Sequence, residues 1–225
     1  MKITSSFVAD EFEWLNPPES ILSGEEAGGG GMFEVADQTL VLTPPAFRDF
    51  WSQTYYSPPL IKSDATGYLH HIPHPCQEEV TVKVDFTYTP VNQFDQAGIL
   101  LFINSKHWMK CGIEFCDGQA RLSVVVCNDY SDWSTQLWTN SLGVRLKVHT
   151  VKQANSIVIE AAPLNTEDYQ FIRIARLDAN EDAGSWRVGP FAACTFQQRG
   201  CTATFSNIYV GPREAAAHNP NLESH

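Results

Sequence analysis

The segment His107–Phe115 places an aromatic ring, a cation and an acid on one face of a predicted strand. Strand side chains alternate between two faces, so Trp108, Lys110, Gly112 and Glu114 share one face. Glu114 is a candidate general acid or base, and Lys110 can pair with it or stabilise negative charge. Trp108 offers a ring for a ligand. The competing interpretation is a structural Lys110–Glu114 ion pair on a half-exposed sheet.

The two faces of this segment differ in polarity. Met109, Cys111, Ile113 and Phe115 alternate with the polar set, and we expect them to be nearly inaccessible. On the polar face Gly112 leaves a gap, as if something packs over the backbone. The segment therefore predicts a sheet with one face for a core and one for a ligand.

Two more strands flank this segment in the prediction, Gln96–Asn104 and Ala120–Asn128, with a hairpin signal at Asp117-Gly118. Gln96 belongs to the open face of its strand and is a candidate ligand-binding residue. Three successive antiparallel strands are therefore expected to form the floor of the site.

Further candidates lie outside these strands. Asp132 and Trp133 fall in a predicted loop, where an aromatic ring beside a carboxylate suits sugar binding; a loop held by a buried Trp is the alternative. Arg173 lies in the apolar run FIRIARL, which looks buried. A buried Arg needs an anionic partner, and Glu114 or a bound anion are the two options.

Metal and cofactor sites are not expected. His70, His71 and His74 have spacing that could bind a metal on a helix, but Pro73 and Pro75 forbid a helix there. The sequence also lacks a phosphate-binding loop and any local signature of a nucleophilic Ser or Cys.

The composition restricts the partners. The 225 residues carry a formal net charge of −11, which repels phosphate backbones. We therefore do not expect this protein to bind nucleic acid. No apolar run of about 18 residues predicts a membrane helix. The N-terminus lacks the apolar core of a secretory signal, and acids follow at once. We therefore expect a cytoplasmic protein without a membrane partner.

The six cysteines favour the same compartment. A chain of this length needs no disulfides for stability, so we expect reduced, structural cysteines with Cys111 as a buried thiol. Cys194 and Cys201 are the best pair if any bond forms, because the residues between them suit a turn.

The pattern of elements predicts an all-β protein. About ten to twelve short strands separated by polar turns, with no convincing amphipathic helix, favour two packed antiparallel sheets. We expect an N-terminal segment with a Gly-rich loop over residues 1–32, one domain over 33–211, and a flexible tail over 212–225. Residues 55–77, rich in Pro, Tyr and His, are predicted to be an irregular functional loop.

Several motifs occur in the order typical of one family. They are RDFW (48–51), DQAG (95–98), HWMKCGIEFCDG (107–118), LSVVV followed by YSDW (122–133), and WRVGPFAACTF (186–196) before TFSNIYVG (204–211). With these motifs the chain resembles the regulation-of-enolase family of concanavalin-A-like lectin/glucanase domains, over roughly residues 33–211. The resemblance implies a jelly-roll β-sandwich with one concave sheet, rimmed by the 55–77 insertion.

The resemblance also bears on catalysis. Laminarinase-type sandwiches commonly carry two acids on one strand as E-x-D-x-x-E, whereas this strand offers Glu114 alone, with Lys110 in the place of a second acid. A glycosidase needs two carboxylates, so this departure counts against hydrolysis.

Three functions remain open. The first is a binding module whose concave cleft holds a sugar or another small polar ligand. The second is an enzyme in the same cleft, a glycosidase, isomerase or cyclase, with Glu114 as acid or base and Lys110 or Arg173 stabilising charge. The third, suggested by the family's name, is a regulator that docks onto a metabolic enzyme. The expected lining residues are Trp51, Gln96, Trp108, Lys110, Glu114, Asp132, Trp133 and Arg173.

Overall fold

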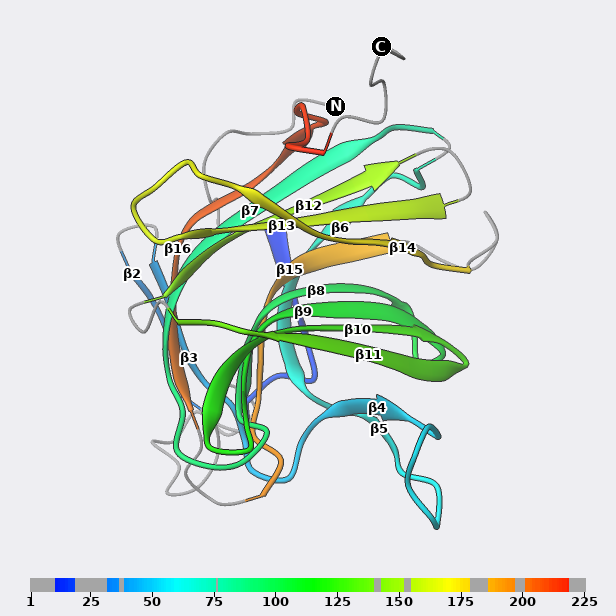
Figure 1. Ribbon diagram of the computed structural model, residues 1–225, viewed down its shortest axis with the longest axis vertical. Helices are drawn as coiled ribbons and strands as arrows, with labels where there is room; N and C mark the ends of the chain where they lie inside the picture. Colours follow the sequence, from blue (N-terminus) through cyan, green and yellow to red (C-terminus); the bar gives the residue numbers. More distant parts are fainter. Residues whose placement is uncertain are drawn as a thin grey trace.

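The protein is a sandwich of two curved antiparallel sheets with a small hairpin beside one of them (Figure 1). The computed structural model describes residues 11–18, 32–36, 39–75, 77–139, 143–151, 155–178, 186–196 and 201–218. Within these residues each large sheet has seven strands, and all of their pairings are antiparallel. This all-β architecture confirms the predicted fold class.

The first sheet carries the predicted site. Its strands, in spatial order, are β1 (Phe12–Leu15), β6 (Thr66–Ile72), β15 (Trp186–Ala193), β8 (Gln96–Asn104), β9 (His107–Cys116), β10 (Gln119–Asn128) and β11 (Tyr130–Leu137).

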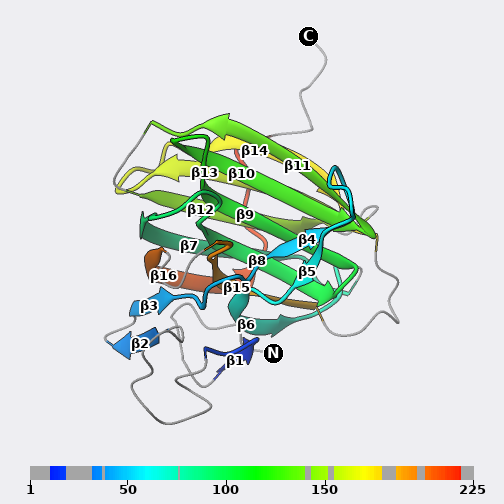
Figure 2. The ribbon, with the colours of Figure 1, turned by 90° about the horizontal axis from the view of Figure 1, so that it is seen from below.

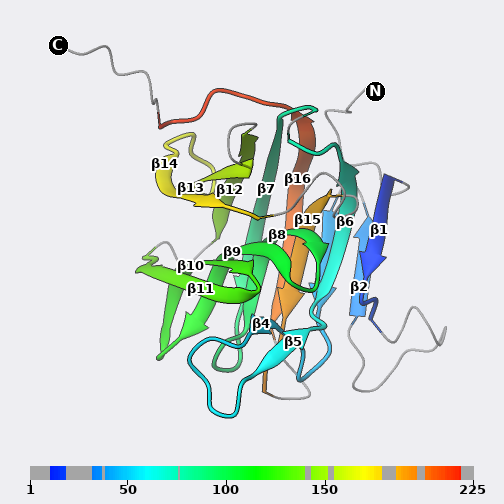
Figure 3. The same cartoon turned by 90° about the vertical axis from the view of Figure 1, so that its right-hand side faces the viewer.

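The second sheet packs against the first. Its order is β14 (Gln170–Arg176), β13 (Ser156–Pro163), β12 (Val144–Val151), β7 (Val80–Thr89), β16 (Thr202–Pro212), β3 (Thr39–Thr43) and β2 (Met32–Ala36). The hairpin consists of β4 (Phe50–Ser52) and β5 (Ile61–Ser63), and lies across the outer face of the first sheet (Figures 2 and 3).

The main core fills the space between the two sheets, because each strand directs alternate apolar side chains inward. Met109, Cys111 and Ile113 of β9 are at most 3% exposed, as the alternation predicts. Phe115 is only half-buried, so the expectation of full burial is wrong at that end of the strand. The parity of β9 is therefore correct, and Phe115 alone among the four expected residues falls short of full burial.

A second apolar cluster covers the other face of the first sheet. The β4–β5 hairpin brings Phe50 over Trp108, with ring centroids 5.4 Å apart, and Trp108 is fully buried. Lys110 and Glu114 on the same face are 3% and 5% exposed. The expectation of an open face around these residues is thus wrong, because the β4–β5 hairpin covers it. The sequence alone did not show that this segment would fold over the sheet.

Two segments differ from their predicted secondary structure. Residues 55–77 contain β5 and β6, so they are not wholly irregular. The YSDW motif lies in strand β11 instead of a loop.

The segments that flank the expected domain also take part in the structure. β1 pairs with β6 at the edge of the first sheet. At the other end, the backbone N–H groups of Ala217 and His218 donate to the buried carboxylate of Glu160. The described parts of both flanks are therefore attached to the sandwich.

The described cysteines form no disulfide. They are Cys111, Cys116, Cys127, Cys194 and Cys201, and all five are buried, whereas Cys76 lies outside the described residues. Burial raises the pKa of Cys111 to about 12, so this thiol is unreactive at neutral pH. No helix in the described part of the chain is long and apolar enough to cross a membrane.

Candidate functional site

The floor of the site is a buried ion pair between the hairpin and the sheet. Lys110 Nζ donates to Asp49 Oδ1 at 2.7 Å, and the two side chains are only 4% and 14% exposed. The same oxygen accepts hydrogen bonds from Gln96 Nε2 at 3.0 Å and from the backbone N–H of Phe50 at 2.7 Å. Lys110 therefore pairs with Asp49, and the predicted Lys110–Glu114 ion pair is wrong.

Local bonds fix the position of Asp49. Its backbone N–H donates to Asp64 Oδ1 at 3.0 Å, and its carbonyl oxygen accepts from the backbone N–H of Asp64 at 3.0 Å. Further along β4, the backbone N–H of Ser52 donates to Ser131 Oγ at 2.9 Å. The hairpin is thus tied both to its own return strand and to β11, which holds Asp49 over the sheet.

Glu114 is held by a separate chain of hydrogen bonds across three strands. Trp133 Nε1 donates to Ser123 Oγ at 2.8 Å, and Ser123 Oγ donates to Glu114 Oε2 at 2.7 Å. These residues belong to β11, β10 and β9, which are neighbours in the sheet. The relay fixes the carboxyl group and the indole ring relative to each other.

Burial raises the pKa of Glu114 above its usual range, because the protein replaces the water that would stabilise the charged form. The positive charge of Lys110 and the hydrogen bond from Ser123 oppose this effect, and the negative charge of Asp49 adds to it. Two carboxyl groups with different environments therefore face the same site: Asp49 is paired with a cation, and Glu114 has an increased affinity for a proton.

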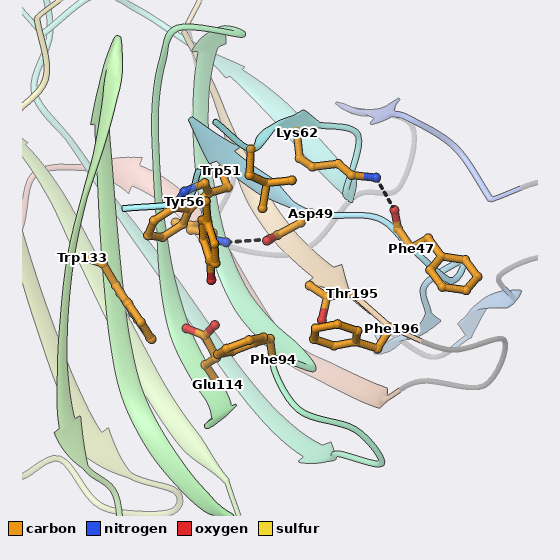
Figure 4. Close-up of a pocket in the computed structure, with 12 residues that line it drawn as sticks. Phe47, Asp49, Trp51, Tyr56, Lys62, Phe94, Glu114, Trp133, Thr195 and Phe196 are labelled. Atoms are coloured by element: carbon orange, nitrogen blue, oxygen red, sulfur yellow. Dashed lines mark hydrogen bonds and ion pairs between the residues drawn. The ribbon is translucent and has the colours of Figure 1, made fainter. Parts of the chain in front are cut away.

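Aromatic rings wall an inner cavity of about 200 Å³ above these polar groups (Figure 4). Figure 4 shows the Glu114 carboxyl group directed toward Tyr56, with Trp133 on one side and Phe94 beside it. The lining residues are Phe47, Asp49, Trp51, Tyr56, Leu60, Lys62, Phe94, Lys110, Glu114, Trp133, Thr195 and Phe196.

A larger outer cavity of about 660 Å³ adjoins the inner one. The two cavities share four aromatic residues: Trp51, Tyr56, Phe94 and Trp133. The outer cavity extends past them to Tyr55, Asp117 and Asp132, among others. The whole cleft thus has an inner part with a polar floor and an outer part with an aromatic and acidic rim.

Two predicted lining residues lie elsewhere. Trp108 is buried beneath the hairpin and lines neither cavity. Arg173 reaches from β14 to the edge of the first sheet, where its guanidinium donates to Asp132 Oδ2 at 2.8 Å and to Ser134 Oγ at 2.7 Å. The predicted partner of Arg173, Glu114 or a bound anion, is therefore wrong, because Asp132 takes that role.

The other predicted residues are divided between the cavities. Trp51 and Trp133 line both, Lys110 and Glu114 line the inner one, and Asp132 lines the outer one. Gln96 lies at the floor, where it supports Asp49. Asp132 and Trp133 point to opposite faces of β11, since Asp132 contacts Arg173 and Trp133 contacts Ser123.

Gly112 has a different role from the predicted one. A Cβ at Gly112 would lie 2.0 Å from the main-chain oxygen of Ala97, and a Cβ at Gly98 would lie 2.0 Å from that of Cys111. The two glycines face each other in register. Close approach of β8 and β9 therefore requires glycine at both positions.

Sequence reasoning missed Asp49, Ser123, Tyr56 and Phe94 as site residues. Asp49 lies two residues before Trp51 in RDFW, so an acid beside a candidate aromatic was a usable signal. Ser123 shares the face of its strand that carries the site, which alternation would have shown. Tyr56 and Phe94 come from turns whose path the sequence does not reveal.

Among the described residues, no three His, Cys, Asp or Glu side chains gather as a metal site would require.

Two curved antiparallel sheets with a covered concave face define a concanavalin-A-like jelly-roll domain. Residues 31–213 match the family described as "Protein of unknown function (DUF1349)". The chain is also 30% identical over 208 residues to "Regulation of enolase protein 1" of Saccharomyces cerevisiae, covering 92% of each chain. The chain therefore belongs to this family, as the motifs predicted.

Solved structures agree with the fold. A functionally unknown protein from Saccharomyces cerevisiae superimposes with a TM-score of 0.77 at 24% identity, covering 93% of this chain and 100% of that one. A legume lectin-like domain from Entamoeba histolytica gives a TM-score of 0.53 at 10% identity, covering 82% and 88% of the two chains. These likenesses establish the architecture.

Proposed function

We propose that this protein binds carbohydrate in the cleft between the β4–β5 hairpin and the first sheet. The observation that carries the proposal is the buried carboxyl group of Glu114 facing a cavity walled by Trp133, Tyr56 and Phe94. The C–H groups of a sugar ring are attracted to the negative faces of aromatic rings. The hydroxyl groups need donors and acceptors, which Glu114 and the Asp49–Lys110 pair supply.

The preorganised geometry supports binding. Ser123 and Trp133 hold the Glu114 carboxyl group, and Lys110 and Gln96 hold that of Asp49, so the ligand need not order them. A pocket with apolar walls and a few convergent polar groups is typical of small-molecule sites. The name of the lectin-like structural neighbour is in keeping with a sugar ligand.

An array of neutral mono- and oligosaccharides tests this proposal, followed by calorimetry with the sugar that binds. Glu114→Ala and Trp133→Ala should each weaken binding by about tenfold or more, equal to about 1.4 kcal/mol. The matched control Glu78→Ala removes an exposed acid outside both cavities and should bind as the parent does. Thermal melts must stay cooperative in all variants. Failure of every sugar to bind would reject the proposal.

An enzymatic role in the same cleft is the second candidate, because Asp49 supplies the second carboxyl group that strand β9 lacks. Asp49 is paired with Lys110, and burial raises the pKa of Glu114, which favours Glu114 as the proton donor in such a reaction. Glu114→Gln separates the two roles, since the amide keeps the shape and can accept the Ser123 hydrogen bond but cannot transfer a proton. A binder keeps most of its affinity in this variant, whereas an enzyme loses turnover of the bound oligosaccharide.

The name of the yeast relative motivates a third candidate, docking onto a metabolic enzyme. Surface plasmon resonance against purified yeast enolase tests it. Binding that Glu114→Ala and Trp133→Ala leave unchanged would place the partner outside the cleft, and would move docking ahead of sugar binding if the array is empty. We also propose a cytoplasmic location, because the described cysteines form no disulfide. The binding experiment can therefore be repeated in cytoplasmic extract.

A further inference from the structure

The aromatic residues of the cleft form a continuous row through both cavities. Successive ring centroids are 5.9 Å apart for Phe196–Phe94, 6.4 Å for Phe94–Trp133 and 6.1 Å for Trp133–Trp51. The row continues at 5.8 Å from Trp51 to Tyr56, and at 5.4 Å from Tyr56 to Tyr55. A single sugar ring contacts only part of such a row.

Both ends of the row reach solvent. Phe196, at the inner cavity, is 51% exposed, and Tyr55, at the outer cavity, is 91% exposed. Between them Trp51 is 8% exposed and packs edge-on against Trp133. Figure 4 shows Phe196 and Phe94 on one side of Glu114, with Trp51 and Tyr56 above it. A ligand longer than the inner cavity can therefore continue outward along the rings.

The backbone of three lining aromatics is strained. Phe47, Tyr55 and Phe94 have φ angles of 60°, 74° and 62°, in the left-handed region that bulky residues rarely adopt. They come from three separate parts of the cleft lining, so a single awkward turn does not account for them. Strain of this kind persists where the surrounding structure enforces it, and it concentrates at functional sites. It indicates that these rings are held in place for contact with a ligand.

The charges of the cleft restrict the ligand further. In the outer cavity the charged lining residues are Asp117 and Asp132, both acids. The cations of the inner cavity, Lys110 and Lys62, lie near the carboxylates of Asp49 and Asp64 at 2.7 Å and 3.8 Å. With a net charge of −11, the protein repels anionic chains. The cleft suits an uncharged polyhydroxyl chain.

We propose that the ligand is a linear, neutral oligosaccharide, with one unit over Glu114 in the inner cavity and the next units along Tyr56 and Tyr55 in the outer cavity. This inference rests on the proposed sugar-binding function and adds to it the size and charge class of the ligand. Tyr55 acts as an outer contact that a monosaccharide does not reach.

Calorimetry with chain-length series tests the inference. The probes are the xylose, glucose, mannose and galactose series from monosaccharide to hexasaccharide, an oligogalacturonate series and a proline-rich peptide. We expect affinity for one neutral series to rise by about tenfold or more between the monosaccharide and the trisaccharide. Tyr55→Ala should remove this gain, so that the trisaccharide binds this variant no more tightly than the monosaccharide does.

The matched control is Tyr130→Ala, which removes a tyrosine that is 61% exposed and lines neither cavity. It should keep the full length dependence. Glu114→Ala should weaken every chain length alike. Both tyrosines are at the surface, so neither variant is expected to unfold the protein.

The other outcomes overturn specific statements. Equal affinity for all chain lengths, or length dependence that survives Tyr55→Ala, overturns the chain inference and leaves sugar binding intact. Preference for oligogalacturonate overturns the neutral class. Binding of the proline-rich peptide with no binding of sugars overturns both this inference and the proposed function.

Discussion

Lys110 Nζ and Asp49 Oδ1 lie 2.7 Å apart although 61 residues separate them in the chain. The pair joins the centre of β9 to the segment that leads into β4, beneath the inner cavity. A buried ion pair contributes little net stability but is costly to break on one side, because the remaining charge has no partner. The site therefore depends on both residues together.

The first prediction concerns this pair. Lys110→Met and Asp49→Asn should each lower the free energy of unfolding by about 3–5 kcal/mol, because each leaves a buried group without its partner. The double variant should lose less than the sum of the two. Urea denaturation measures all three. As a control, Lys106→Met breaks an exposed pair with Asp129 and should cost about 0–1 kcal/mol. Additive losses would show that the two residues do not interact.

The second prediction follows from the raised pKa of Glu114. A carboxyl group whose pKa is higher in the folded state binds a proton more tightly there, so its contribution to stability is present below the usual value of 4.5 and is lost as the pH rises through the folded pKa. Glu114→Gln removes this dependence and keeps an acceptor for Ser123. The variant should therefore gain stability relative to the parent as the pH rises from about 4 to 8.

Denaturation of both proteins across this pH range provides the measurement. A difference in stability that is constant with pH would contradict the raised pKa. A gain for the variant at acid pH, in place of neutral pH, would mean that hydrogen bonds and the charge of Lys110 outweigh burial.

The third prediction concerns the contact of β8 and β9. Gly112→Ala should destabilise the fold by about 1–3 kcal/mol, because the added methyl group collides with the backbone of Ala97. Gly118, in the turn after β9, has a φ of 76° and open space around it. Gly118→Asn is the control and should change the melting temperature little, since Asn tolerates this conformation. Equal melting temperatures for both variants would refute the close approach.

The fourth prediction is the redox state. The chain has six cysteines, and the five that the structure describes are buried and form no disulfide with one another. Titration of freshly prepared protein under denaturing, non-reducing conditions should give six thiols per chain. Four or fewer would show that bonds form in the native protein.

The sequence revealed the strands of the first sheet better than the β4–β5 hairpin that covers them. Alternation and turn signals predicted the bounds of β8, β9 and β10 to within one residue. Alternation also placed Lys110 and Glu114 on the correct face of β9. It could not show that residues 49–63 fold back over that face, because such a contact depends on tertiary packing and on turns with unusual φ angles, such as those at Phe47 and Tyr55. This segment buries Trp108.

The same limit applies to ion pairs. A charged side chain in a strand needs a partner. Spacing within one strand suggested Glu114 for Lys110, and the options for Arg173 were Glu114 or a bound anion. The partners are Asp49 and Asp132, which reach these cations from other segments. Spacing within one strand identifies which groups share a face, whereas the pairing depends on long-range topology.

A crystal structure with a bound oligosaccharide is the most direct test of the central claim. We predict electron density for a sugar ring in the inner cavity, with a hydroxyl group hydrogen-bonded to Glu114 and a ring face against Trp133. Density for the sugar at any other surface, with no sugar in the cavity between the hairpin and the sheet, would contradict the assignment of this cleft as the binding site.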